Sequence, residues 1–317
     1  MIIEVDASMS DAWESDLVCL SDDVRKLNPS SETMRMAADT AKKHLGCLKL
    51  AAKEIRQGKG YILLRGCPVG ELLDVGIPSD GMRPFNKDWV SELALVGSTL
   101  LCGYSPFGYK QERRGRLVHE IAPIKNCGTS ISSIGNIEFK PHADGAYLPR
   151  EHRPETLSLI CLNNEAETST SLTVIDDIVS ELTWEYINIL SSADFVHISP
   201  ETFNVGSRIA KSKSSIIDLV DGRWEVKVAT HNTLGQSVKA RMALELFSEI
   251  AEAKSEKIDW KPGDILIFNN FRCLHSRKDI QGNRWLQRCY GSRILPLGAI
   301  IDLVEQESSE LELLVVV

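Results

Sequence analysis

The stretch FKPHADGAYLPREHRPETLSLICLN, residues 139–163, places a histidine and an aspartate two positions apart, ahead of an apolar run typical of a strand. Side chains at i and i+2 of a strand point to the same face, so His142 and Asp144 can present an imidazole and a carboxylate to one ion. A chain with 7 His and 44 Asp plus Glu residues should contain roughly one such pair by chance. A metal clamp and a polar turn or cap before the strand therefore both stay open from this stretch alone.

A third ligand would complete the two-histidine, one-carboxylate set, which is typical of non-haem Fe(II) sites and leaves three coordination positions open. The remaining histidines are the candidates: His44, His119, His152, His197, His231 and His275. His275 is distinguished by its neighbours, because a Pro-Gly turn, the apolar strand 265–268 and a second turn at Asn269-Asn270 lead up to it.

Two arginines follow His275. Arg284 and Arg288 stand four apart in a strand-like run, and positions i and i+4 share a face, so both guanidinium groups can project into the same interior as His275. A buried guanidinium needs an anion, and it matches a carboxylate with two parallel hydrogen bonds. Trp285 alternates with the arginines and is expected to face outward against a covering helix.

Other polar residues have simpler interpretations. His119 and His197 lie in apolar strand-like runs and are typical of core histidines, whereas His152 and His231 lie in polar loops and are typical of solvated ones. The charged run 110–116 is typical of a solvated face.

Composition limits the function classes. The chain has 317 residues, of which 43% are apolar and 25% charged, and a formal net charge of -8 with a pI near 5.5. This balance argues against a nucleic-acid partner, because phosphate affinity comes from clustered Lys and Arg, and it favours a small-molecule partner. Eight cysteines without a C-x-x-C pair predict reduced, buried thiols and a cytoplasmic location. The sequence contains neither a secretory signal pattern nor an apolar run of membrane-spanning length, so no membrane partner is expected.

Hydrophobic periodicity predicts helices over 30–57, 86–103, 176–192 and 237–255, and strands over 61–66, 157–163, 172–176, 263–270 and 284–294. Short strands with helices in the N-terminal third and as insertions favour an antiparallel barrel or jelly roll supported by helices. No G-x-G-x-x-G or P-loop follows a strand, which argues against a doubly wound sheet. We expect a single domain, with helical support over about 1–60, a jelly-roll core over about 61–295 and a C-terminal tail over 296–317.

Four blocks in chain order carry a family resemblance. They are GKGYILLRGCPVG at 58–70, GYSPFGYKQERRGRLVHEIAPIKN at 103–126, SSIGNIEFKPHADGAYLP at 132–149, and the run from PGDILIFNN at 262–270 to RWLQR at 284–288. The chain resembles Fe(II)- and 2-oxoglutarate-dependent oxygenases of the clavaminate synthase-like group, related to taurine dioxygenase and to the asparagine and arginine hydroxylases of antibiotic biosynthesis. The resemblance implies a double-stranded β-helix, a cupin-like jelly roll with flanking helices.

The resemblance also implies roles for individual residues. The iron ligands would be His142, Asp144 and His275, and Fe(II), 2-oxoglutarate and O₂ would be the cofactor and co-substrates. Arg284 would pair with the distal carboxylate of 2-oxoglutarate. A threonine usually assists there, and Thr173 is the first candidate and Thr170 the second.

For the substrate, the resemblance implies that Arg288 holds an acidic group, with Ser132 and Ser133 as further polar contacts. The expected reaction is hydroxylation of an unactivated C–H bond of a free amino acid or small derivative, with release of succinate and CO₂. Asp144 favours hydroxylation, because related halogenases carry a small residue at that position. A desaturase or cyclase, a catalytically silent binding protein and a carrier-bound substrate remain alternatives. The amino-acid hydroxylases often carry glutamate at the acidic ligand, and the loop before Arg284 is short for them, so the substrate stays open.

Overall fold

The computed structural model describes residues 1–24, 30–46, 48–124, 131, 135–201, 203 and 209–301. Its larger sheet has the strand order β1-β2-β14-β6-β16-β3, with β4 also paired to β16. These strands are β1 (Ile2–Glu4), β2 (Tyr61–Arg65), β14 (Ile265–Asn269), β6 (Thr156–Asn163), β16 (Trp285–Ser292), β3 (Ser105–Phe107) and β4 (Val118–Ile121). All pairs except β1–β2 are antiparallel. The central strands β6 and β14 are apolar on both faces because both faces are covered.

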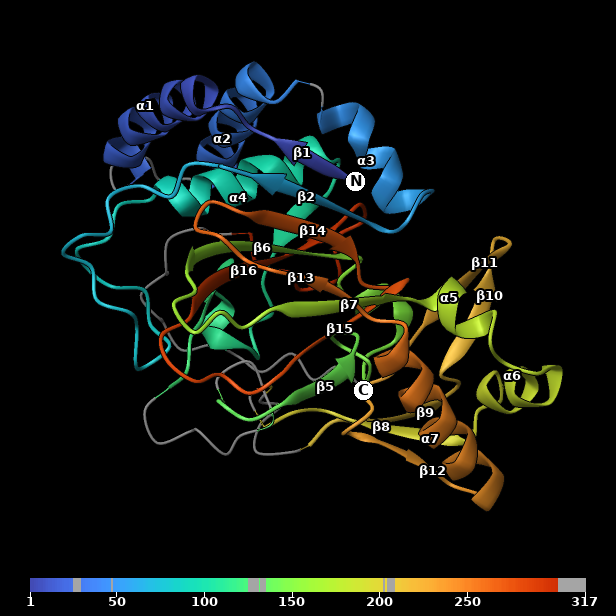
Figure 1. The fold of residues 1–317 in the computed structure, drawn as a ribbon. Helices are drawn as coiled ribbons and strands as arrows, with labels where there is room; N and C mark the ends of the chain where they lie inside the picture. The colour runs from blue at the N-terminus through green and yellow to red at the C-terminus, as the bar shows by residue number, and fades with distance from the viewer. Residues whose placement is uncertain are drawn as a thin grey trace.

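A second sheet supplies the cover on one face (Figure 1). Its order is β13-β7-β15-β5, with β13 (Glu256–Ile258), β7 (Thr170–Val174), β15 (Cys273–Arg277) and β5 (Phe139–His142). Side chains from both sheets, such as Leu159 and Leu266 from one and Leu172 and Cys273 from the other, belong to one buried apolar cluster. The two sheets therefore pack face to face, as a jelly roll requires.

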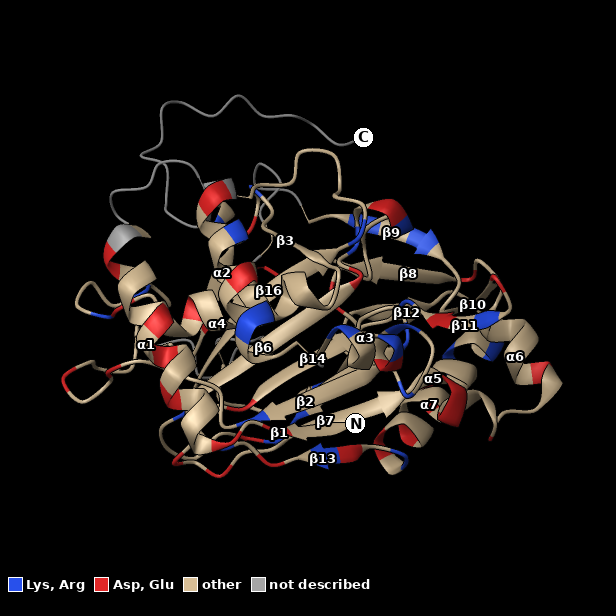
Figure 2. Cartoon of the chain, turned by 90° about the horizontal axis from the view of Figure 1, so that it is seen from above, with Lys and Arg blue, Asp and Glu red and all other residues tan. Residues whose placement is uncertain are grey.

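Helices cover the other face of the larger sheet (Figures 1 and 2). They are α1 (Ala7–Val24), α2 (Ser30–His44), α3 (Leu48–Arg56) and α4 (Val90–Leu101). Trp13 of α1 and Leu95 of α4 share a buried cluster with Ile160 and Ile265 of the sheet. The helical layer thus gives the larger sheet its second apolar contact surface.

A third region packs beside the second sheet. It contains β8 (Phe195–Ile198), β9 (Lys211–Ser214) and β12 (Thr233–Gly235), the hairpin β10 (Ile217–Val220) with β11 (Arg223–Val226), and the helices α5 (Ile175–Val179), α6 (Trp184–Leu190) and α7 (Val238–Ala253). Short 3-10 turns, η1 (Arg113–Gly115) and η2 (Arg150–His152), lie in the connections. Phe247 of α7 and Leu274 of β15 share its core, which fixes α7 against the second sheet.

The predicted strands are confirmed, with β7 starting two residues earlier than expected, but two helix predictions are wrong. The helix expected over 30–57 is two helices, because the chain turns at Gly46, a residue that costs about 1 kcal/mol in a helix. The helix expected over 176–192 is also interrupted, and Thr183 precedes the second helix in extended conformation. Helix α1 was not placed within the expected N-terminal helical support, and the strands of the third region were not predicted, although its helices overlap the expected ranges 176–192 and 237–255. Ser237 caps α7 as expected, by accepting a hydrogen bond from the backbone nitrogen of Ala240.

The helix-facing side of β16 carries a buried polar network. Trp285 lies there, as expected, and its Nε1 donates to Glu120 at 2.5 Å. Gln287 donates through Nε2 to both Glu120 and Glu92 at 3.0 Å. Lys87 pairs with Glu92 at 2.7 Å. Burial and the negative charge of Glu92 raise the pKa of Glu120 to about 7.

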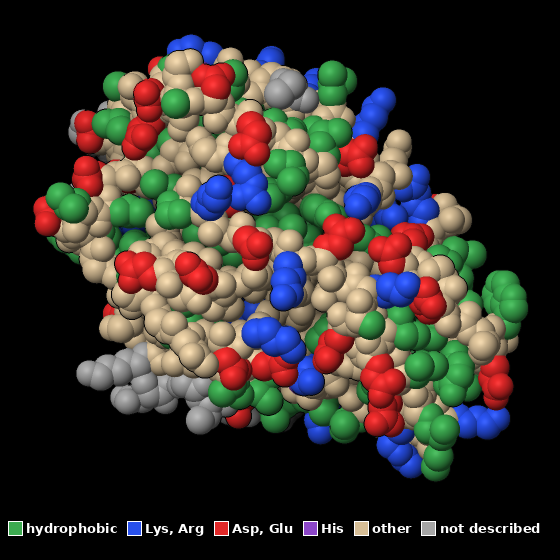
Figure 3. Space-filling view, viewed as in Figure 1, with side chains coloured by type: hydrophobic (Ala, Val, Ile, Leu, Met, Phe, Trp, Pro, Cys, Tyr) green, Lys and Arg blue, Asp and Glu red, His purple; other side chains and the backbone are tan. Residues whose placement is uncertain are grey.

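The surface carries interspersed charges of both signs on the face shown in Figure 3, which fits the expectation of a small-molecule partner. Among the described residues, no helix combines the length and apolarity needed to cross a membrane. The described cysteines carry free thiols, and all of them except Cys19 are buried.

Candidate functional site

His142, Asp144 and His275 meet at the edge of the second sheet. His142 ends β5 and lies opposite His275 of the antiparallel neighbour β15, while Asp144 follows two residues later. Each of the three residues offers one potential ligand atom, and these three atoms lie within 4.8 Å of one another. The Oδ1 atom of Asp144 is 3.4 Å from His142 Nε2 and 3.9 Å from His275 Nε2. The strand pairing therefore creates the cluster that the H-x-D spacing alone left open.

The donor set fits a divalent metal ion. His142 Nδ1 lies 2.8 Å from the carbonyl oxygen of Lys140, which accepts its proton and leaves the Nε2 lone pair directed at the cluster. That Nε2 is buried and has no hydrogen-bond partner within the described part of the chain. Burial would raise the pKa of the Asp144 carboxyl, but the charge of Arg288 and the neighbouring imidazoles of His142 and His275 outweigh it and hold that pKa well below its ordinary value. Two imidazoles and an ionised carboxylate are the donors that non-haem iron prefers.

Asn270 holds the backbone of Asp144 in place. This side chain is fully buried in the turn between β14 and β15. It accepts from the Asp144 nitrogen at 2.8 Å, and its Nδ2 donates to the carbonyl oxygens of Asp144 and Pro154, both at 2.9 Å. The sequence marked Asn270 as a turn residue, but its contact with a segment 126 positions away is visible only in three dimensions.

Arg284 lies in a pocket beside the cluster that we call the Arg284 pocket. It is lined by Ile121, Phe139, His142, Leu159, Thr170, His275, Ser276, Arg277, Arg284, Leu286 and Arg288. Arg284 is 3% exposed, donates from Nη2 to Thr170 Oγ1 at 3.2 Å, and has a buried Nε without a partner among the described residues. Burial and the charge of Arg277 lower the pKa of Arg284 to about 9. No carboxylate lines this pocket in the described part of the chain, so it is built for an anion.

The two candidate threonines face opposite ways. Thr170 Oγ1 accepts from Arg284 and, at 2.9 Å, from Trp260 Nε1, and the residue lines the Arg284 pocket. Thr173 Oγ1 instead donates to the carbonyl oxygen of Ala251 in α7 at 2.7 Å. The structure thus places the second candidate, and not the first, beside Arg284.

Arg288 lies in an adjoining pocket that we call the Arg288 pocket. Its walls are Glu112, Phe139, His142, Ala143, Asp144, Gly145, Ala146, Tyr147, Ile198, Pro200, Ala229, His231, Asn232, Arg288 and Tyr290. Arg288 donates to Asp144 Oδ2 and to Glu112 Oε1, both at 2.8 Å. Glu112 is only 9% exposed and also accepts from the Tyr290 hydroxyl at 3.0 Å. The interpretation of run 110–116 as a solvated face is therefore wrong for Glu112.

Two histidines near Arg288 differ in their environment. His119 is a satisfied core histidine, as expected, because its Nδ1 accepts from Arg288 at 2.8 Å and its Nε2 donates to the Arg116 carbonyl oxygen at 3.0 Å. His231 is not solvated as its polar loop indicated, since its ring packs against Phe139 and His142 in the pocket wall. Ser132 and Ser133 lie outside the described residues.

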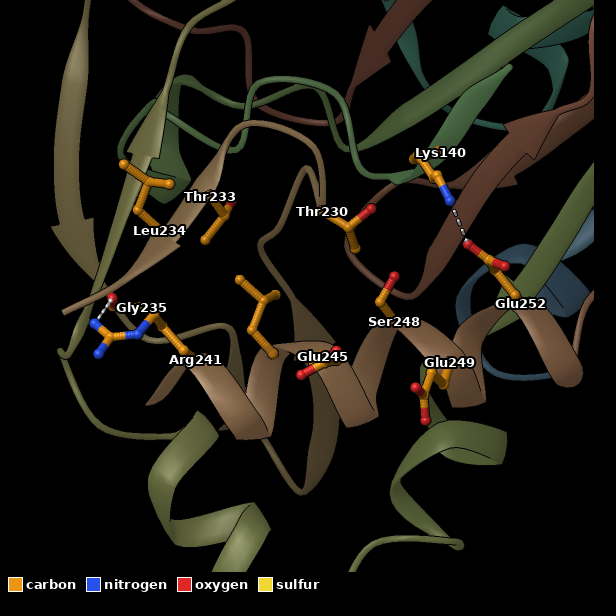
Figure 4. Close-up of a pocket in the computed structure, with 11 residues that line it drawn as sticks. Lys140, Thr230, Thr233, Leu234, Gly235, Arg241, Glu245, Ser248, Glu249 and Glu252 are labelled. Atoms are coloured by element: carbon orange, nitrogen blue, oxygen red, sulfur yellow. Dashed lines mark hydrogen bonds and ion pairs between the residues drawn. The ribbon is translucent and has the colours of Figure 1, made fainter. Parts of the chain in front are cut away.

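A larger and more open hollow, of about 430 Å³, lies between α7 and β12 (Figure 4). Glu245, Glu249 and Arg241 line it, and Lys140 spans it to pair with Glu252 at 3.3 Å. None of the predicted site residues lines this hollow. The candidate site is instead the pair of smaller pockets that share His142.

Known proteins resemble this chain in sequence and in fold. The model of the family described as taurine catabolism dioxygenase TauD, TfdA family, matches residues 227–290, which contain His275, Arg284 and Arg288. The resemblance to Fe(II)/2-oxoglutarate oxygenases is confirmed. An L-ornithine/L-arginine 3-hydroxylase of Catenulispora acidiphila is 24% identical over 60% of this chain, and the match spans 64% of that relative's length. An enduracididine beta-hydroxylase of Streptomyces hygroscopicus is 22% identical over 72% of this chain and 75% of its own length.

Solved structures confirm the fold. An asparagine oxygenase in complex with Fe(II), 2S,3S-3-hydroxyasparagine and succinate superposes with a TM-score of 0.82 at 18% identity, over 92% of this chain and 93% of that chain. The non-heme iron oxygenase OrfP in complex with Fe, succinate and (3S)-hydroxy-L-Arg gives a TM-score of 0.76 at 19% identity, over 92% and 94%. The predicted jelly-roll core with flanking helices is the architecture of these oxygenases, although the described strands form separate sheets and not a closed barrel.

Proposed function

We propose that the chain is an Fe(II)- and 2-oxoglutarate-dependent dioxygenase that hydroxylates an unactivated C–H bond of a free α-amino acid or a small derivative of one. The observation that carries the proposal is the buried Arg284, which has no carboxylate partner among the described residues and lies beside the cluster of His142, Asp144 and His275. When bound, Fe(II) and 2-oxoglutarate would supply O₂ activation, with succinate and CO₂ as the other products.

The residues of the chain bind, orient and exclude water. His142, Asp144 and His275 would hold the metal through two imidazole nitrogens and one carboxylate oxygen. Arg284 would donate two parallel hydrogen bonds to the distal carboxylate of 2-oxoglutarate. The Thr170 hydroxyl oxygen, 3.2 Å from Arg284 Nη2, would orient that guanidinium. The apolar side chains of the Arg284 pocket, such as Leu159 and Leu286, would keep water from the co-substrate.

The Arg288 pocket suits a zwitterion. Arg288 would bind the carboxylate of the substrate amino acid. Glu112, whose Oε1 lies 2.8 Å from Arg288, would accept hydrogen bonds from the ammonium group of the same amino acid. A guanidinium and a carboxylate side by side in a largely buried wall match the two opposite charges of an α-amino acid. Ser132 and Ser133 remain proposed polar contacts of the substrate.

The test is an incubation of purified protein with Fe(II), ascorbate, 2-oxoglutarate and a panel of amino acids, with Asp144→Ala as the control. We expect a gain of one oxygen atom on one amino acid, matched by succinate and absent with the variant. A loss of two hydrogens with matched succinate would favour the desaturase or cyclase instead. A protein that binds neither Fe(II) nor 2-oxoglutarate would contradict the proposal, whereas one that binds them without turning over any substrate would be the catalytically silent binding protein.

The relatives support a free amino acid as the substrate, and we propose that the reaction takes place in the cytoplasm. A carrier-bound amino acid is the alternative. The same assay distinguishes them, because a carrier-bound substrate would give no product with any free amino acid while the protein still binds metal and 2-oxoglutarate.

A further inference from the structure

The segment 228–232 forms one wall of the Arg288 pocket and is fastened to β5. The Ala143 nitrogen donates to the Val228 carbonyl oxygen at 2.8 Å. Thr230 donates to the Pro141 carbonyl oxygen from its nitrogen at 3.2 Å and from its hydroxyl at 2.9 Å. Because Pro141 precedes His142, these hydrogen bonds fix the position of the wall relative to the candidate metal cluster.

His231 lines this pocket and carries a ring nitrogen that no described residue satisfies. Its Nδ1 is buried and has no partner among the residues that the structure describes. Its ring centroid is 5.1 Å from that of Phe139 and 5.7 Å from that of His142, which holds the imidazole beside the cluster. A buried ring nitrogen without a partner costs about 1–3 kcal/mol, so the natural partner is a polar group that enters the pocket.

The charges of the pocket limit what that group can be. The carboxylates among its described walls are Glu112 and Asp144, and the basic side chain is Arg288. In the proposed function Asp144 binds the metal, while Glu112 and Arg288 bind the ammonium and carboxylate that every α-amino acid carries. A second charge on the substrate would find no opposite partner among the described residues of this wall, and burial of an unpaired charge costs several kcal/mol.

We infer that the pocket selects an amino acid with a neutral, hydrogen-bonding side chain, such as a carboxamide or a hydroxyl, and that His231 is the residue that recognises it. A carboxamide donates and accepts, so it fits either tautomer of the imidazole. The inference rests on the proposed function and narrows its substrate class. It separates this chain from the relative named for ornithine and arginine, whose side chains are cationic.

The test uses the protein loaded anaerobically with Fe(II) and 2-oxoglutarate, whose complex has a visible absorption band that responds when substrate binds nearby. Asparagine, glutamine, serine and homoserine represent neutral side chains; arginine, ornithine and lysine cationic ones; aspartate and glutamate acidic ones. We expect one neutral amino acid to bind at least about 100-fold more tightly than any charged one, since a site built for a polar group rejects poor matches strongly. Succinate formation in air then gives kcat/KM for the same panel.

Two variants isolate the recognition. His231→Phe keeps the ring and removes both nitrogens, and it should lower kcat/KM for the preferred neutral amino acid about 10- to 100-fold without changing the 2-oxoglutarate band. Asn232→Asp adds a carboxylate to the same wall with almost no change in shape, and it should shift the preference toward cationic amino acids. His152→Phe, outside both pockets, is the matched control and should behave as the wild type.

Three results would overturn the inference: tighter binding of a charged amino acid, an equal loss for all amino acids in His231→Phe, or a 2-oxoglutarate band that no neutral amino acid perturbs. Absence of the band itself would instead refute the proposed function. The two failures are therefore distinguishable in one experiment.

Discussion

Replacement of Arg284 by methionine should stabilise the ligand-free protein and abolish its response to 2-oxoglutarate. Methionine keeps most of the length of the side chain and removes a buried charge that has no carboxylate partner in the described part of the chain. The neighbours Ile121, Leu159 and Leu286 give it an apolar contact surface. A residue kept for a ligand lowers stability until that ligand binds.

The magnitude follows from the pKa of Arg284, which burial lowers from the ordinary value of an arginine to about 9. Each pH unit corresponds to about 1.4 kcal/mol, so the charged form costs at most about 5 kcal/mol in the ligand-free protein. Structural adjustment around the guanidinium lowers this cost in the wild-type protein. We therefore expect the Arg284→Met variant to gain about 1–3 kcal/mol in free energy of unfolding. Loss of a buried bidentate pair should weaken 2-oxoglutarate binding by about 2–5 kcal/mol, which is roughly 30- to 5,000-fold.

The assay is urea unfolding with and without 2-oxoglutarate, with Mn(II) in place of iron so that no turnover occurs, and calorimetric titration of 2-oxoglutarate. Arg35→Met is the matched control, because Arg35 lies on the surface of α2 and pairs with the exposed carboxylates of Glu32 and Asp39. A destabilised Arg284→Met variant that still binds 2-oxoglutarate as the wild type does would refute the reasoning, since Arg284 would then be a structural residue.

Three further changes test neighbouring parts of the site. Thr170→Val should weaken 2-oxoglutarate binding about 3- to 30-fold by calorimetry, whereas Thr173→Val should leave binding unchanged and cost about 1 kcal/mol in urea unfolding; the reverse pattern would restore the first candidate. Asn270→Ala should lower metal affinity about 10- to 100-fold in a Mn(II) titration, because it releases the backbone of Asp144; unchanged affinity would contradict that role. The pKa of Glu120 lies at about 7, above its ordinary 4.5, so its stabilising contribution is complete below pH 4.5 and is lost as the pH rises through 7. Glu120→Gln should remove this decline, so that between pH 5 and 8 the free energy of unfolding of the wild type, measured in urea, falls by up to about 3 kcal/mol more than that of the variant. Parallel pH profiles of the two proteins would contradict this prediction.

Local patterns predicted the strands because strands depend on short sequence spacing, and they marked the residues that strand pairing brings together in the candidate metal cluster. The strand before His275 and the i, i+4 arginines follow strand alternation, and the packing of the two sheets brings them together. Asp144 lies in the turn after β5 and not in a strand, so the expectation that His142 and Asp144 share a strand face was wrong. Alternation also places Thr170 and Thr173 on opposite faces of β7. It cannot say which face meets the site, since that depends on pairing with β15, where Arg277 lies opposite Thr170.

The residues that the sequence missed come from segments whose local pattern is polar. Glu112 lies in a charged run and His231 in a polar loop, yet Glu112 is buried and His231 half-buried because both line a pocket formed with distant segments. A buried salt bridge such as Glu112 with Arg288 joins positions 176 apart, beyond the reach of any periodicity. The helix errors have a more local cause: apolar spacing on both sides of Gly46 is helical, and the turn between the two helices does not interrupt that spacing.

The carboxylate of Asp144 links the two halves of the proposed reaction. Its Oδ1 faces the nitrogens of His142 and His275, whereas its Oδ2 accepts from Arg288 at 2.8 Å. A cation at the cluster would draw negative charge toward Oδ1 and weaken the hold of Oδ2 on Arg288. The guanidinium would then be freer to bind the carboxylate of a substrate. Because coupling between two ligands is reciprocal, a substrate bound to Arg288 must change the metal affinity by the same factor. A pocket whose charges are shared between two ligands thus favours the amino acid only after the metal is in place.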